Sequence, residues 1–162
     1  MRSKNRYQIP CDLAYLRATL SDARFHNGPL LHAIDFILRE GTAVYAALDG
    51  IVVDMKMDSF IGGPDPEFVR DANYITLQHV GGEFSEYVHL QHASGIVDEG
   101  DYVGVGQLIA RSGNTGYSTT PHLHFHVGRS ARTTLGWRTI EPIFMSDIPI
   151  DRISVRRTAM EK

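Results

Sequence analysis

Short segments rich in hydrophobic residues follow one another along most of the chain, with glycine and proline between them, and residues 73–79 and 122–127 alternate apolar with polar side chains. Alternation of this kind is typical of β-strands that bury one face. The predicted strands are residues 41–48, 51–55, 73–79, 83–90 and 122–127. Asp49-Gly50 predicts a hairpin turn between the first two, because this pair favours a two-residue turn. The succession of strands and turns predicts an antiparallel, mainly β domain.

The first part of the chain shows a different pattern. Three leucines within residues 11–24 are spaced by three and four positions, which predicts a short N-terminal helix. Residues 59–72 contain two glycines and two prolines and are predicted to form a loop. The arginine-containing tail, residues 147–162, is predicted to be solvated. We therefore expect a single domain over 1–162, with its motifs in a core of about 26–146.

Composition narrows the class of protein. Hydrophobic residues make up 43% and charged residues 22% of the 162 residues, values typical of a globular domain. The formal charge of −3 argues against a general nucleic-acid binder, and no apolar run is long enough for a membrane span. No signal peptide is apparent after the charged start. A single cysteine, Cys11, excludes an internal disulfide. Nothing in the composition indicates an oligomeric state.

Eight histidines stand out in this composition, and three of them lie in one predicted strand. His122, His124 and His126 occupy alternate positions of residues 122–127, so they share one face. The apolar residues between them can pack into a core, but apolar packing does not account for the histidine face. Two imidazoles at this spacing can approach one metal ion or one water molecule. A solvent-facing polar stripe is the alternative.

Other histidines and one aspartate extend this chemistry. Asp35 lies in an apolar run, where a buried carboxylate needs a metal, a cation or hydrogen-bond donors. His89 lies at the end of another predicted strand. Catalytic zinc sites commonly use three His, Asp, Glu or Cys ligands and leave a position for water. His79 and His92 are interpreted as structural or exposed, the usual state of a lone strand histidine.

Several motifs resemble a known family when they are taken together and in order. They are AIDF at 33–36, GTAVYAALDGIV at 41–52, YVHL at 87–90, GDYVGVGQ at 100–107, GNTG at 113–116 and PHLHF at 121–125. Over about residues 26–128 the chain resembles the lysostaphin/LytM-type zinc endopeptidases, which cut peptide bonds in bacterial peptidoglycan. The resemblance implies the compact antiparallel β-sheet or sandwich fold of that family. It also implies that Asp35 and His124 bind one zinc ion, with His89 and His122 as non-ligand histidines beside the metal-bound water.

The third zinc ligand departs from the commonest family pattern. That pattern has a histidine four residues before the aspartate, and Leu31 occupies this position. His32 lies three residues before Asp35 and would face the opposite side of an extended strand. His26 lies further upstream, beyond a loop at 27–29 that can return it to the site. His26 is therefore the predicted ligand, with His32 as the alternative.

The resemblance also implies a mechanism and a partner. The chain lacks H-E-x-x-H, so histidine rather than glutamate must transfer protons around a zinc-activated water. Residues 59–72 and 112–120 are expected to form two walls of a groove for a peptidoglycan peptide. His32, Asn114 and Tyr117 are expected to border it. The family implies a location in the cell envelope (periplasm) or outside the cell.

Three other functions compete with a zinc-dependent endopeptidase. Met55-Lys56-Met57 matches a biotinylated tripeptide, but the glycine hairpin that should precede it follows it. An iron(II) oxygenase would use His-x-Asp, whereas two residues separate His32 from Asp35. A non-catalytic family member, which binds peptidoglycan or regulates the envelope, would be expected to have lost ligands. The sequence does not specify which peptide bond is cut.

Overall fold

The computed structural model describes residues 1–21, 24 and 26–146. Within these residues the regular structure is strand, apart from three short 3-10 helices, η1 (Gly28–Leu30), η2 (Pro66–Asp71) and η3 (Val80–Gly82). The strands are β1 (Arg2–Tyr7), β2 (Ala18–Leu20), β3 (Ile34–Ile37), β4 (Ala43–Tyr45), β5 (Gly50–Lys56), β6 (Gly62–Gly63), β7 (Tyr74–Gln78), β8 (Glu83–Val88), β9 (Tyr102–Val103), β10 (Leu108–Arg111), β11 (Gly116–Tyr117), β12 (Leu123–Ser130) and β13 (Trp137–Phe144).

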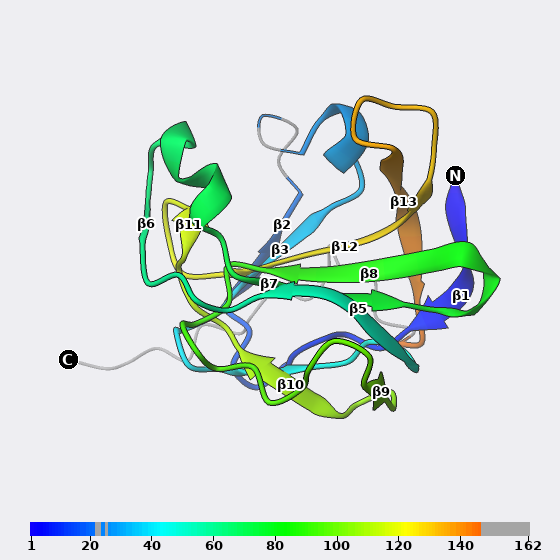
Figure 1. Ribbon diagram of the computed structural model, residues 1–162, viewed down its shortest axis with the longest axis horizontal. Coiled ribbons are helices and arrows are strands. Elements are labelled where there is room, and N and C mark those ends of the chain that lie inside the picture. The colour runs from blue at the N-terminus through cyan, green and yellow to red at the C-terminus, as the bar shows by residue number, and fades with distance from the viewer. Residues whose placement is uncertain (22–23, 25, 147–162) are drawn as a thin grey trace.

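Nine of these strands form one curled sheet. Its order is β1-β13-β12-β8-β7-β5-β9, and β3 joins it beside β12 and carries β2. Strands β7, β8 and β12 run side by side across the middle of the molecule (Figure 1). One side of β12 pairs with β8. The other side is shared, with β3 opposite 123–125 and β13 opposite 127–130. This shared edge places β3 in register with the histidine-containing half of β12.

The mainly β prediction is confirmed, with one difference in strand direction. The segments predicted over 73–79 and 83–90 contain β7 and β8, and the segment predicted over 122–127 covers the first part of β12, which continues to Ser130. These three strands pair antiparallel. However, β1 pairs with β13 in parallel, and β6 pairs with β11 in parallel. The sheet is therefore mixed. Strands β1 and β13 were not predicted, because their pairing joins opposite ends of the chain and leaves no local signal.

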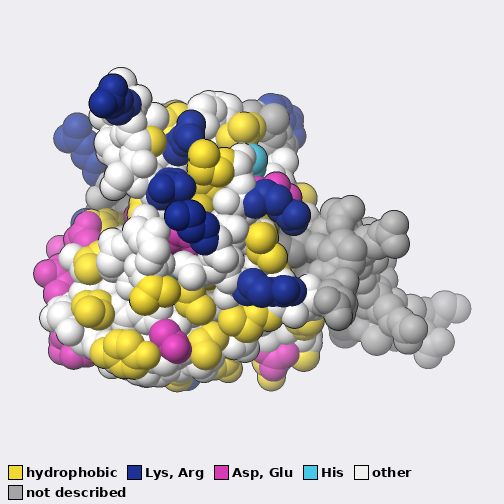
Figure 2. Space-filling model, turned by 90° about the vertical axis from the view of Figure 1, so that its right-hand side faces the viewer, with side chains coloured by type: hydrophobic (Ala, Val, Ile, Leu, Met, Phe, Trp, Pro, Cys, Tyr) yellow, Lys and Arg dark blue, Asp and Glu magenta, His cyan; other side chains and the backbone are white. Residues whose placement is uncertain are grey.

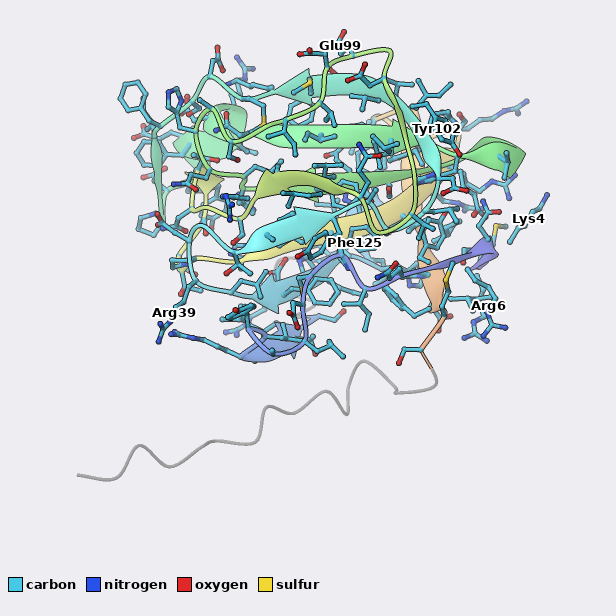
Figure 3. All side chains as sticks on the ribbon, turned by 90° about the horizontal axis from the view of Figure 1, so that it is seen from below. Lys4, Arg6, Arg39, Glu99, Tyr102 and Phe125 are labelled. Atoms are coloured by element: carbon cyan, nitrogen blue, oxygen red, sulfur yellow. The ribbon has the colours of Figure 1, made fainter. Side chains whose placement is uncertain are left out.

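The core lies on one face of the sheet. Leu123, Phe125 and Val127 alternate along β12 and are fully buried, as their apolar pattern predicts. They belong to one hydrophobic cluster with Val44 of β4 and Ile109 of β10, two strands that pair with each other outside the large sheet. Figure 3 labels Phe125 in the interior and Lys4, Arg6 and Arg39 at the periphery. The opposite face of β12 is thus left for polar side chains.

The predicted helix over 11–24 is wrong. Residues 13–15 form a turn, in which the Asp12 carboxylate accepts a hydrogen bond from the Ala14 N–H at 2.8 Å, and β2 follows. Of the three leucines, Leu16 is buried, while Leu13 and Leu20 are 40% and 49% exposed. Pairing of β2 with β3 overrides the local helical spacing.

The predicted hairpin at Asp49-Gly50 is also wrong. Strand β4 pairs with β10, whereas β5 pairs with β7 and β9, so the two strands around this dipeptide are not partners. The glycine serves close packing instead. A Cβ atom on Gly50 would lie 2.7 Å from the carbonyl oxygen of Gln78 and 2.8 Å from Nδ1 of His79. Gly50 therefore lets β5 approach the end of β7.

Cations line the outer edge of the sheet. Arg2, Lys4 and Arg6 are exposed and alternate with the buried Ser3 and Tyr7 along β1. Figure 2 shows lysine and arginine side chains gathered over the upper half of the side of the molecule that carries the N-terminus. Charged residues on an edge strand discourage pairing with another chain.

Two expectations from the sequence concern the ends and the membrane. In the part of the chain that the structure describes, no helix has the length and apolarity needed to cross a bilayer. The predicted solvated tail, 147–162, lies outside the described residues.

Candidate metal centre

Three potential ligands converge on the polar face of β12. Asp35 of β3 and His124 of β12 are directly paired across the two antiparallel strands, so their side chains share one face. His26 arrives from the segment before η1. Oδ1 of Asp35 lies 3.0 Å from Nδ1 of His124 and 3.2 Å from Nε2 of His26. One ligand atom from each of the three residues lies within 4.8 Å of the others.

This cluster fits a tetrahedral metal ion. Ligand atoms bound to zinc at about 2.0–2.1 Å in tetrahedral geometry stand about 3.3 Å apart. The separations of 3.0 and 3.2 Å around Asp35 are close to that value. Two imidazoles and a carboxylate are a donor set that zinc accepts. Of the two histidines left open by the sequence, the structure brings His26 to Asp35, and His32 is not in the cluster.

A third nitrogen points at the same carboxylate oxygen. Nε2 of His122 lies 3.6 Å from Oδ1 of Asp35, while Nδ1 of His122 lies 2.7 Å from the carbonyl oxygen of Thr120. Because a carbonyl oxygen only accepts, Nδ1 carries the proton of a neutral ring. Nε2 then presents its lone pair toward a carboxylate oxygen. Two electron-rich atoms that face each other in this way are stabilised by a cation between them.

His89 is held in the same way. Its Nδ1 donates to the carbonyl oxygen of Thr115 at 2.7 Å, so its Nε2 is free to accept a proton. Its ring centroid lies 4.5 Å from that of His122 and 6.0 Å from that of His124. The structure thus brings together all five residues that the sequence singled out as catalytic or ligating. The two backbone carbonyls escaped the sequence analysis, because a backbone acceptor leaves no signature in the residue types.

The electrostatics separate the carboxylate from the histidines around it. Burial alone would raise the pKa of Asp35, but hydrogen bonds from His124 and His26 outweigh it and hold that pKa well below its ordinary value. Burial lowers the pKa of His122. Burial and then the neighbouring charges of His122 and His124 lower the pKa of His89 to about 3. At neutral pH the site therefore holds an ionised carboxylate and two neutral imidazole bases.

His126 lies behind the ligand cluster. It is buried, its Nδ1 lies 3.3 Å from Nε2 of His124, and its ring stacks on Trp137 with centroids 5.0 Å apart. A histidine that binds a metal through one nitrogen usually donates its other N–H to an acceptor. His126 can be that acceptor for His124. The three histidines predicted to share one face therefore have different surroundings: His124 belongs to the ligand cluster, His122 lies beside it and His126 lies behind it.

The remaining histidines lie away from the cluster. His32 is half-buried, and its backbone N–H donates to Thr139 Oγ1 at 3.0 Å. His92 is exposed and meets the ring of Phe60 edge-on. His79 is buried on the core side, with Nδ1 bonded to the carbonyl oxygen of Asp49 and Nε2 to Ser85 Oγ, each at 2.8 Å. The interpretation of His79 and His92 as structural or exposed agrees with these positions.

The two expected groove walls lie against each other. Strand β6, within 59–72, pairs with β11, within 112–120, and Gly62 lies opposite Gly116 (Figure 1). A Cβ atom on Gly62 would overlap a backbone carbonyl of the partner segment. The prediction of two separate walls is therefore wrong, because the two segments form one paired unit. Asn114 and Tyr117, both half-buried, belong to it. Their contact with a substrate stays a prediction, as does that of His32.

The part of the chain that carries most of this site matches a known peptidase family. The model of peptidase family M23 matches residues 29–135, about two thirds of the chain. The chain belongs to peptidase family M23. Its matched segment includes Asp35, His89, His122 and His124, whereas His26 lies just outside it.

The chain is also similar to curated proteins. Lysostaphin of Staphylococcus simulans is 39% identical over 100 residues, which are 61% of this chain and 18% of that protein. The peptidoglycan DD-endopeptidase ShyA of Vibrio cholerae is 36% identical over 102 residues, 63% of this chain and 20% of that protein. The chain therefore spans about a fifth of the length of these relatives.

Two solved structures resemble this M23 chain. The catalytic domain of lysostaphin from Staphylococcus simulans superposes with a TM-score of 0.53 at 30% identity, covering 83% of this chain and 87% of that one. A zinc-containing peptidase from Vibrio cholerae gives a TM-score of 0.57 at 30% identity, covering 76% and 36%. The fold is that of the lysostaphin-type M23 peptidases.

Proposed function

We propose that this M23 chain is a zinc-dependent endopeptidase that hydrolyses peptide bonds of peptidoglycan, either in cross-bridges or in stem peptides. The observation that carries the proposal is the crowding of three imidazole nitrogens around one oxygen of Asp35. His26, Asp35 and His124 would hold the ion. Zinc bound there would supply Lewis acidity, which polarises the scissile carbonyl and makes a water molecule more acidic.

His122 and His89 carry out the proton transfers in this mechanism. Each ring is anchored by a backbone carbonyl at Nδ1 and leaves Nε2 unprotonated. One of them accepts the proton of the attacking water at Nε2. A protonated ring then donates to the leaving amine or stabilises the developing oxyanion. Burial favours the neutral form of both rings, which keeps them ready to accept a proton.

The relatives support the proposed substrate and location. Relatives of this chain include peptidoglycan DD-endopeptidases and a glycyl-glycine endopeptidase. A chain with this activity would meet its substrate in the cell envelope or outside the cell. Because those relatives differ in the bond that their names specify, we leave the bond of this chain to experiment.

The test combines metal analysis with digestion of purified peptidoglycan and mass spectrometry of the fragments. Wild type is expected to bind one zinc ion and to release peptide fragments that identify the bond. His122→Ala should keep its zinc while hydrolysis falls at least about a hundredfold, the scale of general acid–base catalysis. His92→Ala is the matched control and should hydrolyse like wild type. Unchanged turnover of His122→Ala would remove this residue from the mechanism. Zinc binding without any released fragment would favour a non-catalytic, peptidoglycan-binding member of the family.

A further inference from the structure

His89 has an unusual backbone for a non-glycine residue. Its φ angle is 65°, in the left-handed region, directly after the last residue of β8. Steric repulsion between Cβ and the backbone disfavours this region for all residues except glycine. Among the described residues, only Ala93 shares this feature outside glycine. The surrounding structure must therefore hold His89 in place.

Hydrogen bonds to the backbone of the next residue, Leu90, hold His89 in this conformation. Both peptide groups of Leu90 are fixed by two residues from other segments. The Leu90 N–H donates to the carbonyl oxygen of Asn73 at 3.1 Å. The Leu90 carbonyl oxygen accepts from Nδ2 of Asn73 at 3.2 Å and from Oγ1 of Thr115 at 2.8 Å. The chain therefore leaves β8 through a fixed point one residue beyond His89.

Asn73 is suited to this task by its amide. It is fully buried, and its side chain pairs with the backbone of Ser59, accepting from its N–H at 2.9 Å and donating to its carbonyl oxygen at 2.7 Å. Its own N–H donates to Oγ1 of Thr115 at 3.1 Å. A carboxylate of the same size could not donate to the carbonyl oxygens of Ser59 and Leu90. The position thus requires asparagine for its donors, not only for its volume.

Thr115 closes the network around the ring of His89. Its hydroxyl binds Leu90 and Asn73, while its carbonyl oxygen accepts from Nδ1 of His89 at 2.7 Å. We propose that Asn73, together with Thr115, is a positioning residue that holds His89 in the left-handed conformation from which its ring enters the site. This inference rests on the proposed function only for its kinetic consequence. The three proposed ligands lie outside this network, so metal binding should not depend on it.

The first test does not require activity. Protein labelled with ¹⁵N at histidine is measured with and without zinc, and long-range ¹H–¹⁵N spectra report which ring nitrogen of His89 carries a proton. In wild type the proton should be on Nδ1. In Asn73→Asp the His89 signals should shift or broaden, while those of His79 stay in place. Unchanged His89 signals in a folded Asn73→Asp variant would overturn the proposal, whatever the enzyme assays show.

The second test uses kinetics in two backgrounds. Asn73→Asp should lower kcat at least about tenfold, because it misplaces a group of general acid–base catalysis. KM should stay within about twofold and zinc content at one equivalent. In a His89→Ala background the same substitution should change kcat by less than about twofold, since the residue through which Asn73 acts is gone. Equal losses in both backgrounds would refute a role through His89.

Matched variants separate positioning from general destabilisation. Asn5→Asp is the control, because the amide of Asn5 also joins two segments, at 2.8 Å from the Val80 carbonyl oxygen and 3.0 Å from Glu83, but far from the site along the sheet. It should lower stability without moving the His89 signals or kcat. If Asn73→Asp does not fold, Thr115→Val removes the hydroxyl at nearly constant volume and should shift the same signals. Thr115→Ser keeps the hydroxyl and should therefore leave the His89 signals as in wild type. Failure of the proposed peptidase activity would appear as no hydrolysis in wild type, and the spectra would still decide the positioning role.

Discussion

Two clusters of polar side chains lie on opposite faces of the same sheet, the His79 group and the metal-centre group around Asp35. Their histidines satisfy their ring nitrogens in different ways. On the core face, both ring nitrogens of His79 have hydrogen-bond partners, the Asp49 carbonyl oxygen and Ser85 Oγ. Ser85 Oγ in turn donates a hydrogen bond to the Tyr87 hydroxyl at 3.0 Å. On the other face, nitrogens of three histidines surround one oxygen of Asp35.

The difference teaches how to tell a structural histidine from a ligand. Burial alone does not, since His79 and His26 are 5% and 3% exposed. What differs is the number of partners per polar atom. In the His79 group each nitrogen has one partner, as buried polar groups require. In the metal-centre group several nitrogens compete for one acceptor, and Nδ1 of His26 has no hydrogen-bond partner among the described residues. The first arrangement gives each ring nitrogen of His79 a partner, whereas the second leaves Nδ1 of His26 without one among the described residues.

The largest effect is expected from removing the negative charge of the Asp35 carboxylate, which distinguishes the metal-centre group from the His79 group. Asp35→Asn keeps the shape but takes away the anion around which His26, His122 and His124 gather. Zinc binding should be lost and hydrolysis should fall at least about a thousandfold, because metal catalysis supplies several kcal/mol. Metal analysis and fragment release measure both. Asp54→Asn, which changes an exposed aspartate bonded to Tyr74, should leave both intact. Full zinc occupancy in Asp35→Asn would show that the cluster is not a metal site.

A smaller effect separates the two candidate third ligands. His26→Ala should weaken zinc binding about a hundredfold or more, since it removes one of the three proposed ligands. His32→Ala should change zinc affinity by less than about twofold, because this side chain lies outside the cluster. Competition with a chelator of known affinity measures both variants. The reverse order of effects would move the third ligand to His32.

The His79 group should respond in stability instead of metal binding. His79→Ala leaves the Asp49 carbonyl and Ser85 without their buried partner, which should lower the free energy of unfolding by at least about 2 kcal/mol. Denaturant titration of the metal-free protein measures this loss. Zinc stoichiometry should remain at one ion. A variant that keeps its stability but loses zinc would place His79 in the other group.

The sequence predicted which side chains gather at the candidate site better than it predicted the framework around it. Asp35, His89, His122 and His124 were proposed from strand parity and the family motifs, which act over a few residues, and the structure brings them together, while their roles stay predictions. His26 was preferred by the parity argument against His32, and its place beside Asp35 depends on a loop that the sequence only permits. Asn73 was missed, since the sequence places it at the start of the strand predicted over 73–79, whereas its partners Ser59, Leu90 and Thr115 lie in other segments.

Long-range pairing explains the errors in the fold. Residues 11–24 have helical spacing, but an isolated helix of this length is only marginally stable in water. Residues 18–20 pair with β3 instead. Asp49-Gly50 resembles a hairpin turn, but its glycine serves the approach of β5 to His79. In both cases a segment distant in sequence decides the local structure. Local pattern cannot contain that information.

The smallest and most specific prediction uses pH to compare the two groups. Burial lowers the pKa of His79, whereas an unfolded histidine titrates near about 6.5. Below that pH the unfolded chain binds a proton that the native His79 does not, so the stability contributed by neutral His79 is complete above about 6.5 and declines as the pH falls. The decline is at most about 1.4 kcal/mol per pH unit for one proton. In the metal-free protein the stability gap between wild type and His79→Ala should therefore narrow from pH 7 to pH 5. Both proteins keep the metal-centre histidines, so their titration largely cancels in the difference. A gap that widens toward acid pH would mean that native His79 is protonated, and its neutral two-partner arrangement, the basis of the contrast with the metal centre, would be wrong.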